Sequence, residues 1–190
     1  MSSCEERPVV IVVLDEAVPP SSCDGCGGSF KLWGYARTRV IRDGGAVRRL
    51  LRPRRIRCGG CLVTHVLLPA VFVARRADSA QVILAALLAK ASGRGHRPIA
   101  ADLRLPPGTV RGWLRRASAN AEPVRARAMR FAVEADPLLG PIEPAGTVLG
   151  DALEAVGVAA AAVRRRLGPL GPPLPIAMII GSGLLHPLRT

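Results

Sequence analysis

Aromatic residues and lysines are scarce in this sequence of 190 residues. Phe, Trp and Tyr together make up 3% of it, and Lys31 and Lys90 are the only lysines among its 27 basic residues. Because single-stranded nucleic acids are usually held by stacking on aromatic rings, so few rings make RNA binding a weak interpretation. Apolar residues nevertheless make up 49% of the chain, so we expect a folded core rather than wholesale disorder.

Long hydrophobic runs are also absent. The start, MSSCEERPVV, is acidic and leads into a short apolar run, so we expect no secretory signal. The apolar stretch that begins at Ile176 is interrupted by Gly181 and Gly183, whereas a membrane-spanning helix needs about 20 apolar residues. We therefore expect a cytoplasmic protein without a membrane partner. In a reducing compartment, paired cysteines bind metal more often than they form disulfides.

Acidic residues are few relative to basic ones. The 14 Asp and Glu residues against 27 Lys and Arg residues give a formal net charge of +13. Arginine-rich composition partly reflects GC-rich codons, but a basic surface also attracts polyanions and gains free energy from the release of counterions. The charge favours nucleic acid as a partner, and the alternative is a basic surface that is merely solvated.

Four of the five cysteines form two C-x-x-C pairs, Cys23–Cys26 and Cys58–Cys61. Two β-like runs, residues 30–41 and 46–56, lie between the pairs, and Asp43-Gly44-Gly45 is a typical hairpin turn between them. Such a hairpin brings the second pair beside the first, which is the arrangement of a zinc ribbon. A redox C-x-x-C motif and a pair of disulfides are the less favoured alternatives.

Four thiolates are a complete ligand set for tetrahedral zinc, so these cysteines predict a structural Zn²⁺ without an open position for catalysis. Glycine permits the tight turns that such pairs require, and the glycines concerned are Gly25, Gly27, Gly59 and Gly60. We expect Cys4 to be a free thiol near the terminus and His65 to be structural. Pro53 is expected to weaken the second strand.

The run from Ile99 to Leu114 has the spacing of a helix-turn-helix. Its inward positions are predicted to be Ile99, Ala100, Leu103, Leu105, Val110, Trp113 and Leu114. A small residue such as Ala100 is needed where two helices cross closely. Two features depart from the usual pattern: Arg104 occupies a turn position that is usually Gly, and Pro106-Pro107 replaces the usual Ser or Thr cap.

The solvent face of the second helix is predicted to contact DNA. It offers Thr109, Arg111, Gly112, Arg115 and Arg116. Arginine and small residues on such a helix suit a major groove, where Arg111 and Arg115 would read bases. The alternative is an ordinary helical hairpin with a basic outer face. Arg116 is expected to contact phosphate. Phosphate contacts are also expected in the ribbon, from Arg48, Arg49, Arg52, Arg54, Arg55 and Arg57, unless these ribbon arginines form a solvated face.

The predicted fold class is α+β: a small β zinc ribbon followed by an all-α helix-turn-helix region and two further helices. The domain boundaries are expected at residues 1–74, 75–120 and 121–190. A first helix should follow a cap at Asp78 or Ser79. Further helices are expected over about 98–103, 107–119, 122–135 and 147–167.

Several segments resemble the N-terminal head of insertion-sequence transposases. They are Leu32-Trp33-Gly34-Tyr35, Arg54 to Cys61, Thr64 to Pro69 and the helix-turn-helix run. The likeness is greatest to stand-alone helix-turn-helix proteins of unknown function from high-GC bacteria, which share an ending similar to Gly181-Ser-Gly-Leu-Leu185. This resemblance implies binding to transposon ends or operators, with zinc as the scaffold.

Transposase catalysis is not implied, because the acidic residues after position 120 are spread over helix-like and proline-rich sequence. We therefore predict a non-enzymatic, sequence-specific protein that binds double-stranded DNA and takes no small-molecule substrate. The alternative is an interaction module that pairs with a transposase or forms a homodimer. An apolar stripe from Ala159 to Val163, with Val156 and Leu167, would suit such pairing, although an intramolecular core explains it better.

Overall fold

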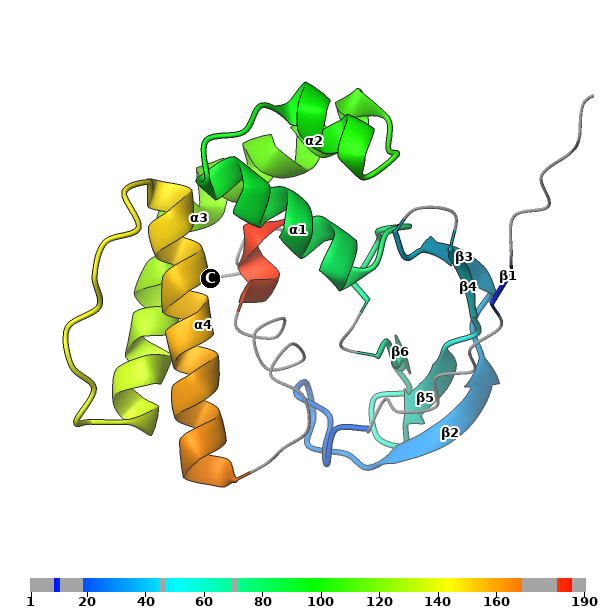
Figure 1. Cartoon of the computed structure of the whole chain (residues 1–190). Helices are drawn as coiled ribbons and strands as arrows, with labels where there is room; N and C mark the ends of the chain where they lie inside the picture. The colour runs from blue at the N-terminus through cyan, green and yellow to red at the C-terminus, as the bar shows by residue number, and fades with distance from the viewer. Residues whose placement is uncertain (1–8, 11–18, 45–46, 70–71, 169–180, 186–190) are drawn as a thin grey trace, which may run out of the picture. The chain divides into compact units, whose positions relative to one another are not determined.

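The protein is described by a computed structural model over residues 9–10, 19–44, 47–69, 72–168 and 181–185. Its elements divide between two compact units, Met1–Ser79 and Ala80–Thr190. The described β-strands lie in the first unit and the described α-helices in the second (Figure 1). The predicted α+β class is therefore confirmed. The helices expected for the helix-turn-helix and for the C-terminal region lie in the same unit.

The strands of the first unit are β1 (Val9–Val10), β2 (Phe30–Tyr35), β3 (Arg39–Arg42), β4 (Arg48–Leu51), β5 (Arg54–Cys58) and β6 (Thr64–Val66). They form two three-stranded sheets, in the orders β1-β4-β3 and β2-β5-β6. β1 pairs in parallel with β4, and the other pairs are antiparallel. The predicted strand from Val9 to Leu14 is seen as β1 alone, because residues 11–14 lie outside the described part.

The predicted hairpin is present, but each of its arms is broken into two strands. The turn lies between β3 and β4, where the N–H of Asp43 donates to the carbonyl of Val47 at 3.1 Å. In the second arm the break falls at Pro53, which has no N–H for a ladder. The N–H of Ala36 donates to the Pro53 carbonyl at 2.8 Å and joins the arms at that point. As a result, β3 and β4 belong to one sheet, while β2 and β5 belong to the other. The β2–β5 pair ends beside the cysteines.

The hydrophobic core of the first unit is small. Ile41, Leu51 and Phe72 are buried together, and Leu68 packs against them. In the other sheet, Ile56 is also buried. A domain of this size buries too little apolar surface to be very stable alone, and many such domains add a disulfide or a metal.

A forked ion pair fastens the last residues of this unit to its sheet. Arg42 donates from Nε and Nη2 to the two carboxylate oxygens of Asp78 at 2.7 and 2.9 Å, and Asp78 is buried. These hydrogen bonds raise the pKa of Arg42. The Arg42 N–H also donates to Ala77, and Ser79 donates to the Arg42 carbonyl. The carboxylate of Asp78, expected as a helix cap, is therefore bound by Arg42.

The second unit contains α1 (Ala80–Ala91), α2 (His96–Asp102), α3 (Pro107–Ala135), α4 (Val148–Leu167) and the 3₁₀ turn η1 (Gly181–Leu184). The prediction of two helices over 107–119 and 122–135 is wrong, because α3 runs without a break through Pro123. One buried stripe keeps the helix continuous, at Ala117, Ala121, Val124, Ala128 and Ala132. Burial of this stripe offsets the loss of one backbone hydrogen bond, which in a helix interior costs roughly 3 kcal/mol.

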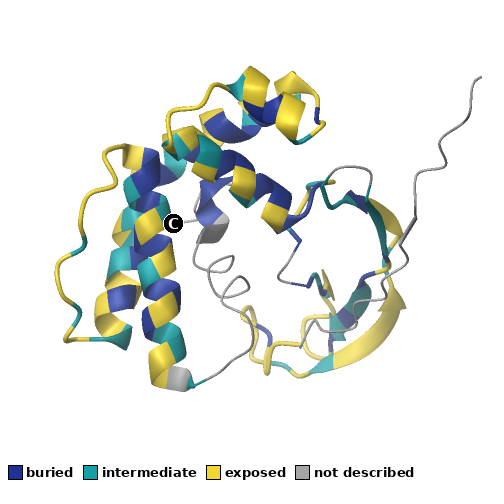
Figure 2. Ribbon diagram, viewed as in Figure 1, coloured by how far each residue is buried: buried dark blue, intermediate teal, exposed yellow. Residues whose placement is uncertain are grey.

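Helices α3 and α4 pack side by side through small residues and run in the same direction (Figures 1 and 2). Their C-terminal ends meet: Arg165 pairs with Asp136 at 2.8 Å, and Arg166 donates to the carbonyl of Glu134 at 2.5 Å. Parallel helices bring their negative C-terminal ends together, so the arginines in the last turn of α4 stabilise this packing. At the other end, Thr147 caps α4 through Gly150.

The stripe predicted for helix pairing belongs to this intramolecular core. Val156, Ala159, Ala160 and Ala162 are buried and Val163 is half-buried, whereas Ala161 is exposed. The side chain of Leu167 lies outside the described part. Self-association stays a prediction and would need another surface. Leu184 and Leu185 of the C-terminal motif are buried too, and Asn120 of α3 donates to the Leu184 carbonyl at 3.2 Å. Among the described residues, no helix combines the length and apolarity of a membrane span.

Candidate metal centre and helix-turn-helix

The four paired cysteines converge at one end of the β2–β5 ladder. Cys23 and Cys26 lie in the turn before β2, Cys58 ends β5, and Cys61 lies in the turn that follows. The register pairs Phe30 with Cys58, and Gly59 donates to the carbonyl of Ser29 at 2.9 Å. These backbone contacts hold the two C-x-x-C turns against each other, as the sequence predicted.

The distances between the sulfur atoms suit a single metal ion. All four sulfurs lie within 4.8 Å of one another. Cys23 Sγ is 3.7 Å from Cys61 Sγ, and Cys26 Sγ is 3.4 Å from Cys58 Sγ. In a tetrahedral thiolate site with metal–sulfur bonds of about 2.3 Å, sulfurs are separated by about 3.8 Å. The cluster therefore has the donor set and the spacing to bind a metal ion.

The backbone approaches this cluster so closely that two positions leave no room for a side chain. A Cβ on Gly28 would lie 2.9 Å from Cys58 Sγ and 3.3 Å from Cys26 Sγ. A Cβ on Gly60 would lie 3.2 Å from Cys26 Sγ, and the Gly60 N–H donates to Cys58 Sγ at 3.4 Å. Gly60 was among the predicted turn glycines, but Gly28 was missed. Its position two residues after a C-x-x-C pair is the signal that could have indicated it.

The thiols of Cys58 and Cys61 have different pKa values, because their neighbours differ. The backbone N–H of Cys61 stabilises the thiolate of Cys58 and lowers its pKa to about 6. The N–H of Val63 acts in the same sense on Cys61, but the neighbouring Cys26 and Cys58 sulfurs outweigh it and raise the pKa of Cys61 to about 11. A bound cation would remove this competition, because a metal-bound cysteine is a thiolate.

His65 is not part of the cluster. Its ring stacks edge-on against Phe30, with 5.2 Å between the ring centroids. His65 therefore has a structural role in packing, as expected. Cys4, expected to be a free thiol, lies outside the described residues.

The predicted inward face of the helix-turn-helix packs as expected. Six of its positions are buried, and Leu103 is half-buried; the six are Ile99, Ala100, Leu105, Val110, Trp113 and Leu114. α2 ends at Asp102, and α3 begins at Pro107 with Pro106 as its N-cap. Proline is preorganised for the first helical turn, so the missing Ser or Thr cap does not prevent the helix from starting there.

The turn after α2 has the geometry of a Schellman motif. Leu105 donates to the carbonyl of Ala100 at 2.9 Å, and Arg104 donates to Ala101 at 3.1 Å. Arg104 adopts a left-handed conformation with φ of 53°. This conformation is the one that glycine usually supplies, and Leu105 is the buried apolar residue that accompanies the motif. The arginine therefore occupies a glycine position without changing the turn.

The predicted DNA-contacting residues of α3 lie on its outer side. Arg111, Arg115 and Arg116 are exposed, whereas Thr109 and Gly112 are half-buried. Arg111 and Arg115 are four residues apart and so share one helix face. Arg116 Nη1 donates to the carbonyl of Gly112 at 3.1 Å, which lays its side chain along its own helix.

With both features described, the chain was compared with known proteins. Residues 23–113 match the family model of a domain of unknown function (DUF6431). The match extends from the first cysteine of the cluster to the buried Trp113, so one family pattern includes the four cysteines and the helix-turn-helix run as far as Trp113. Searches of curated proteins and of solved structures gave no match. No link to transposases is shown, and that resemblance stays a prediction.

The strand register within the matched region separates the arginines predicted to bind phosphate. Arg55 and Arg57 alternate with the buried Ile56 and lie on the opposite face of β5 from it, while Arg54 lies on the same face as Ile56. All three arginines are half-buried. Of the others, Arg49 pairs with Asp43, and Arg48 donates to the carbonyl of Val47 at 3.2 Å.

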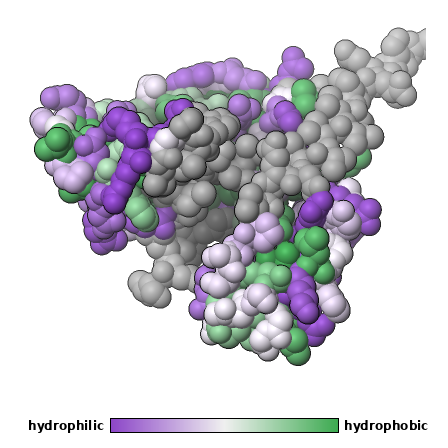
Figure 3. All heavy atoms as spheres, turned by 90° about the horizontal axis from the view of Figure 1, so that it is seen from below, coloured by the Kyte–Doolittle hydropathy of each residue, from purple (hydrophilic) through white to green (hydrophobic). Residues whose placement is uncertain are grey.

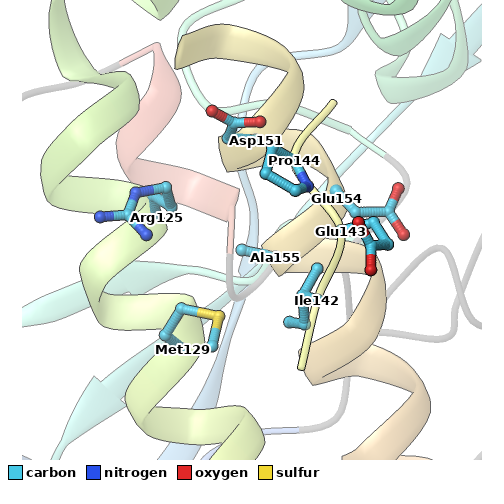
Figure 4. Close-up of a pocket in the computed structure, with 8 residues that line it drawn as sticks. All are labelled: Arg125, Met129, Ile142, Glu143, Pro144, Asp151, Glu154 and Ala155. Carbon is cyan, nitrogen blue, oxygen red and sulfur yellow. The ribbon is translucent and has the colours of Figure 1, made fainter. Parts of the chain in front are cut away.

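A cavity of about 200 Å³ lies outside the DUF6431 match, between α3, α4 and the segment that joins them (Figure 4). Two of its charged side chains make structural contacts. Arg125 makes a fork with Glu122 at 2.6 and 2.8 Å, and Asp151 accepts from the N–H of Ala145 at 2.7 Å. The lining includes no histidine, cysteine, serine or threonine, so we assign it no chemistry.

The close packing around the sulfurs predicts that Gly28→Ala weakens metal binding. The added Cβ would push two sulfurs apart, and overpacking of this kind costs about 1–3 kcal/mol. We expect a fall of roughly tenfold to a hundredfold in affinity for Co²⁺, measured by the colour of its tetrahedral thiolate complex. Gly25→Ala is the matched control, since its Cβ would lie 4.0 Å from Cys23 Sγ. Equal Co²⁺ affinities for the two variants would contradict the proposed crowding.

The left-handed turn predicts that Arg104→Gly stabilises the second unit. Glycine adopts this conformation without steric strain, which is worth about 1 kcal/mol relative to a residue with a Cβ. We expect Arg104→Gly to unfold at higher urea concentration than Arg104→Ala. Both variants lack the guanidinium, so their difference isolates the backbone. Identical urea midpoints would show that the turn does not have this conformation in solution.

Proposed function

We propose that this protein is a non-enzymatic, sequence-specific binder of double-stranded DNA, in which α2 and α3 act as a helix-turn-helix. The observation that carries the proposal is the combination of a buried face with an exposed basic one. α2 and α3 pack through Ile99, Ala100 and Trp113, while Arg111 and Arg115 stay exposed in the first turns of α3. A Schellman turn is a common end of a helix, so the feature that distinguishes this pair from an ordinary helical hairpin is the two arginines on one exposed face.

The start of α3 is suited to a major groove. Arg111 and Arg115 project from one face, and each guanidinium can donate two hydrogen bonds to a guanine. Thr109 and Gly112 are small, so they would let the helix approach the base edges closely. Arg116 lies along the helix and is better placed for a phosphate than for a base. Arg55 and Arg57 of the ribbon would add sequence-independent phosphate contacts.

We propose zinc as the ion held by Cys23, Cys26, Cys58 and Cys61. Four thiolates at tetrahedral spacing are the usual ligands of structural zinc. The ion would cross-link the two turns and would leave no coordination position for a substrate. In this proposal the metal centre supports the ribbon, and sequence recognition lies in α3. Transposon ends or operators are the targets suggested by the resemblance to transposase heads.

The base-reading role predicts that Arg111→Ala/Arg115→Ala abolishes sequence preference. Bound genomic fragments would first be selected with the wild-type chain and sequenced, and affinity would then be measured in a shift assay at fixed salt. Since each bidentate arginine contributes about 1–3 kcal/mol, we expect a loss of at least about thirtyfold for the selected site.

The matched control is Lys90→Ala/Arg130→Ala, which removes two exposed charges from other parts of the same unit. This control should keep the preference for the selected site over random duplex and lose only a little affinity through its lower charge. If both double variants lose affinity equally and keep the same preference, α3 does not read bases.

A further inference from the structure

The outward face of the β2–β5–β6 sheet combines an exposed aromatic ring with positive charge. The register places on this face Lys31, Trp33, Arg55, Arg57, Thr64 and Val66. Three of these six side chains are cations, and none is acidic. Hydrophobic and hydrophilic residues lie next to one another over the visible part of this unit (Figure 3). The face is therefore basic and amphipathic rather than simply charged.

Trp33 is held on this face in a defined environment. Trp33 is 51% exposed, and the guanidinium of Arg57 lies 4.6 Å from the centroid of its ring. Arg57 is fixed in turn, because its Nε donates to the carbonyl of Leu62 at 3.3 Å. A ring covered by a guanidinium on one side still offers apolar surface to a second planar group. The scarce aromatic residues of the sequence thus supply a stacking surface at this position.

A β-bulge separates Trp33 from the other exposed aromatic of the strand. The register shifts between Leu32 and Tyr35, so that Trp33 and Gly34 together lie opposite Arg55. Gly34 has a φ of 74°, a left-handed conformation that glycine adopts without steric strain. After the bulge, Tyr35 pairs with Arg54 and lies on the other face, where the guanidinium of Arg52 stacks on it at 4.6 Å.

We propose that this outward face, centred on Trp33, binds single-stranded DNA. A base would stack on Trp33, and Lys31, Arg55 and Arg57 would contact the flanking phosphates. The charge of the face complements a polyanion, whereas an apolar protein partner would have to desolvate three cations. Duplex DNA would leave the ring without a stacking partner, because its bases are already stacked on one another. Aromatic residues are few in the chain, but a single exposed ring beside three cations is enough for one stacking site.

This inference rests on the proposed function in one respect, the choice of DNA over RNA. A chain that reads duplex DNA through α3 would meet a single strand where that duplex opens or ends. The protein would then bind nucleic acid through two different surfaces, one for sequence and one for unpaired bases.

The test is the affinity of the full chain for a labelled oligothymidine, measured by fluorescence anisotropy for wild-type protein, Trp33→Ala, Trp33→Phe and Tyr35→Ala. Because base stacking on an aromatic ring contributes about 1–3 kcal/mol, we expect Trp33→Ala to bind about tenfold more weakly. Trp33→Phe should bind nearly as well as wild type. Tyr35→Ala removes an equally exposed, arginine-stacked ring from the opposite face and should leave the affinity unchanged.

A second readout is the tryptophan fluorescence. A stacked base should quench Trp33 in wild-type protein, and this quenching should be absent from Trp33→Phe although that variant still binds. Equal affinities of Trp33→Ala and wild type, or equal losses in Trp33→Ala and Tyr35→Ala, would overturn the proposal. Tighter binding of oligouridine than of oligothymidine would overturn the choice of DNA.

The same assay separates this proposal from the proposed function. Arg111→Ala/Arg115→Ala should lose duplex affinity and keep its affinity for oligothymidine, whereas Trp33→Ala should show the reverse. If the arginine variant bound duplex as wild type does, the helix-turn-helix function would fail, and the comparison of Trp33 variants on oligothymidine would still stand.

Discussion

The first unit depends on the approach of four cysteine sulfurs to one point. Its described apolar core is small, and a metal ion bound by the sulfurs would join turns that are far apart in the sequence. At this end of β2 and β5 the backbone packs closely against the sulfurs. At Gly28 and Gly60 an added Cβ would lie too close to a sulfur atom. The ladder that they fix carries Trp33 and Arg57 on its outward face, so the proposed single-strand surface depends on the same cluster.

The second unit is stabilised differently, by close packing of small residues and by well-formed helix ends. Ala117, Ala121 and Ala128 let α3 lie close to α4, and the arginines at the end of α4 bind the C-terminal end of α3. α3 thus has two roles along its length. Its first turns present Arg111 and Arg115, and the rest is core, so the proposed reading surface is built on a rigid helix.

The features that were predictable from the sequence are those set by local spacing. The C-x-x-C pairs, the hairpin turn and the buried positions from Ile99 to Leu114 follow from periods of a few residues. The features that the sequence did not predict depend on tertiary contacts. Pro123 indicated a helix break, yet burial of Val124 and its neighbours against α4 keeps α3 whole. The bulge at Gly34, which separates Trp33 from Tyr35, has no clear sequence pattern before the register is known.

The central claim is that Cys23, Cys26, Cys58 and Cys61 together hold one zinc ion. The direct measurement is the zinc content of the purified full chain, by native mass spectrometry with inductively coupled plasma analysis. The account predicts about one zinc per chain, and loss of that zinc with unfolding of the first unit in Cys58→Ser. Less than about half an equivalent of zinc in a folded, reduced wild-type chain would contradict it.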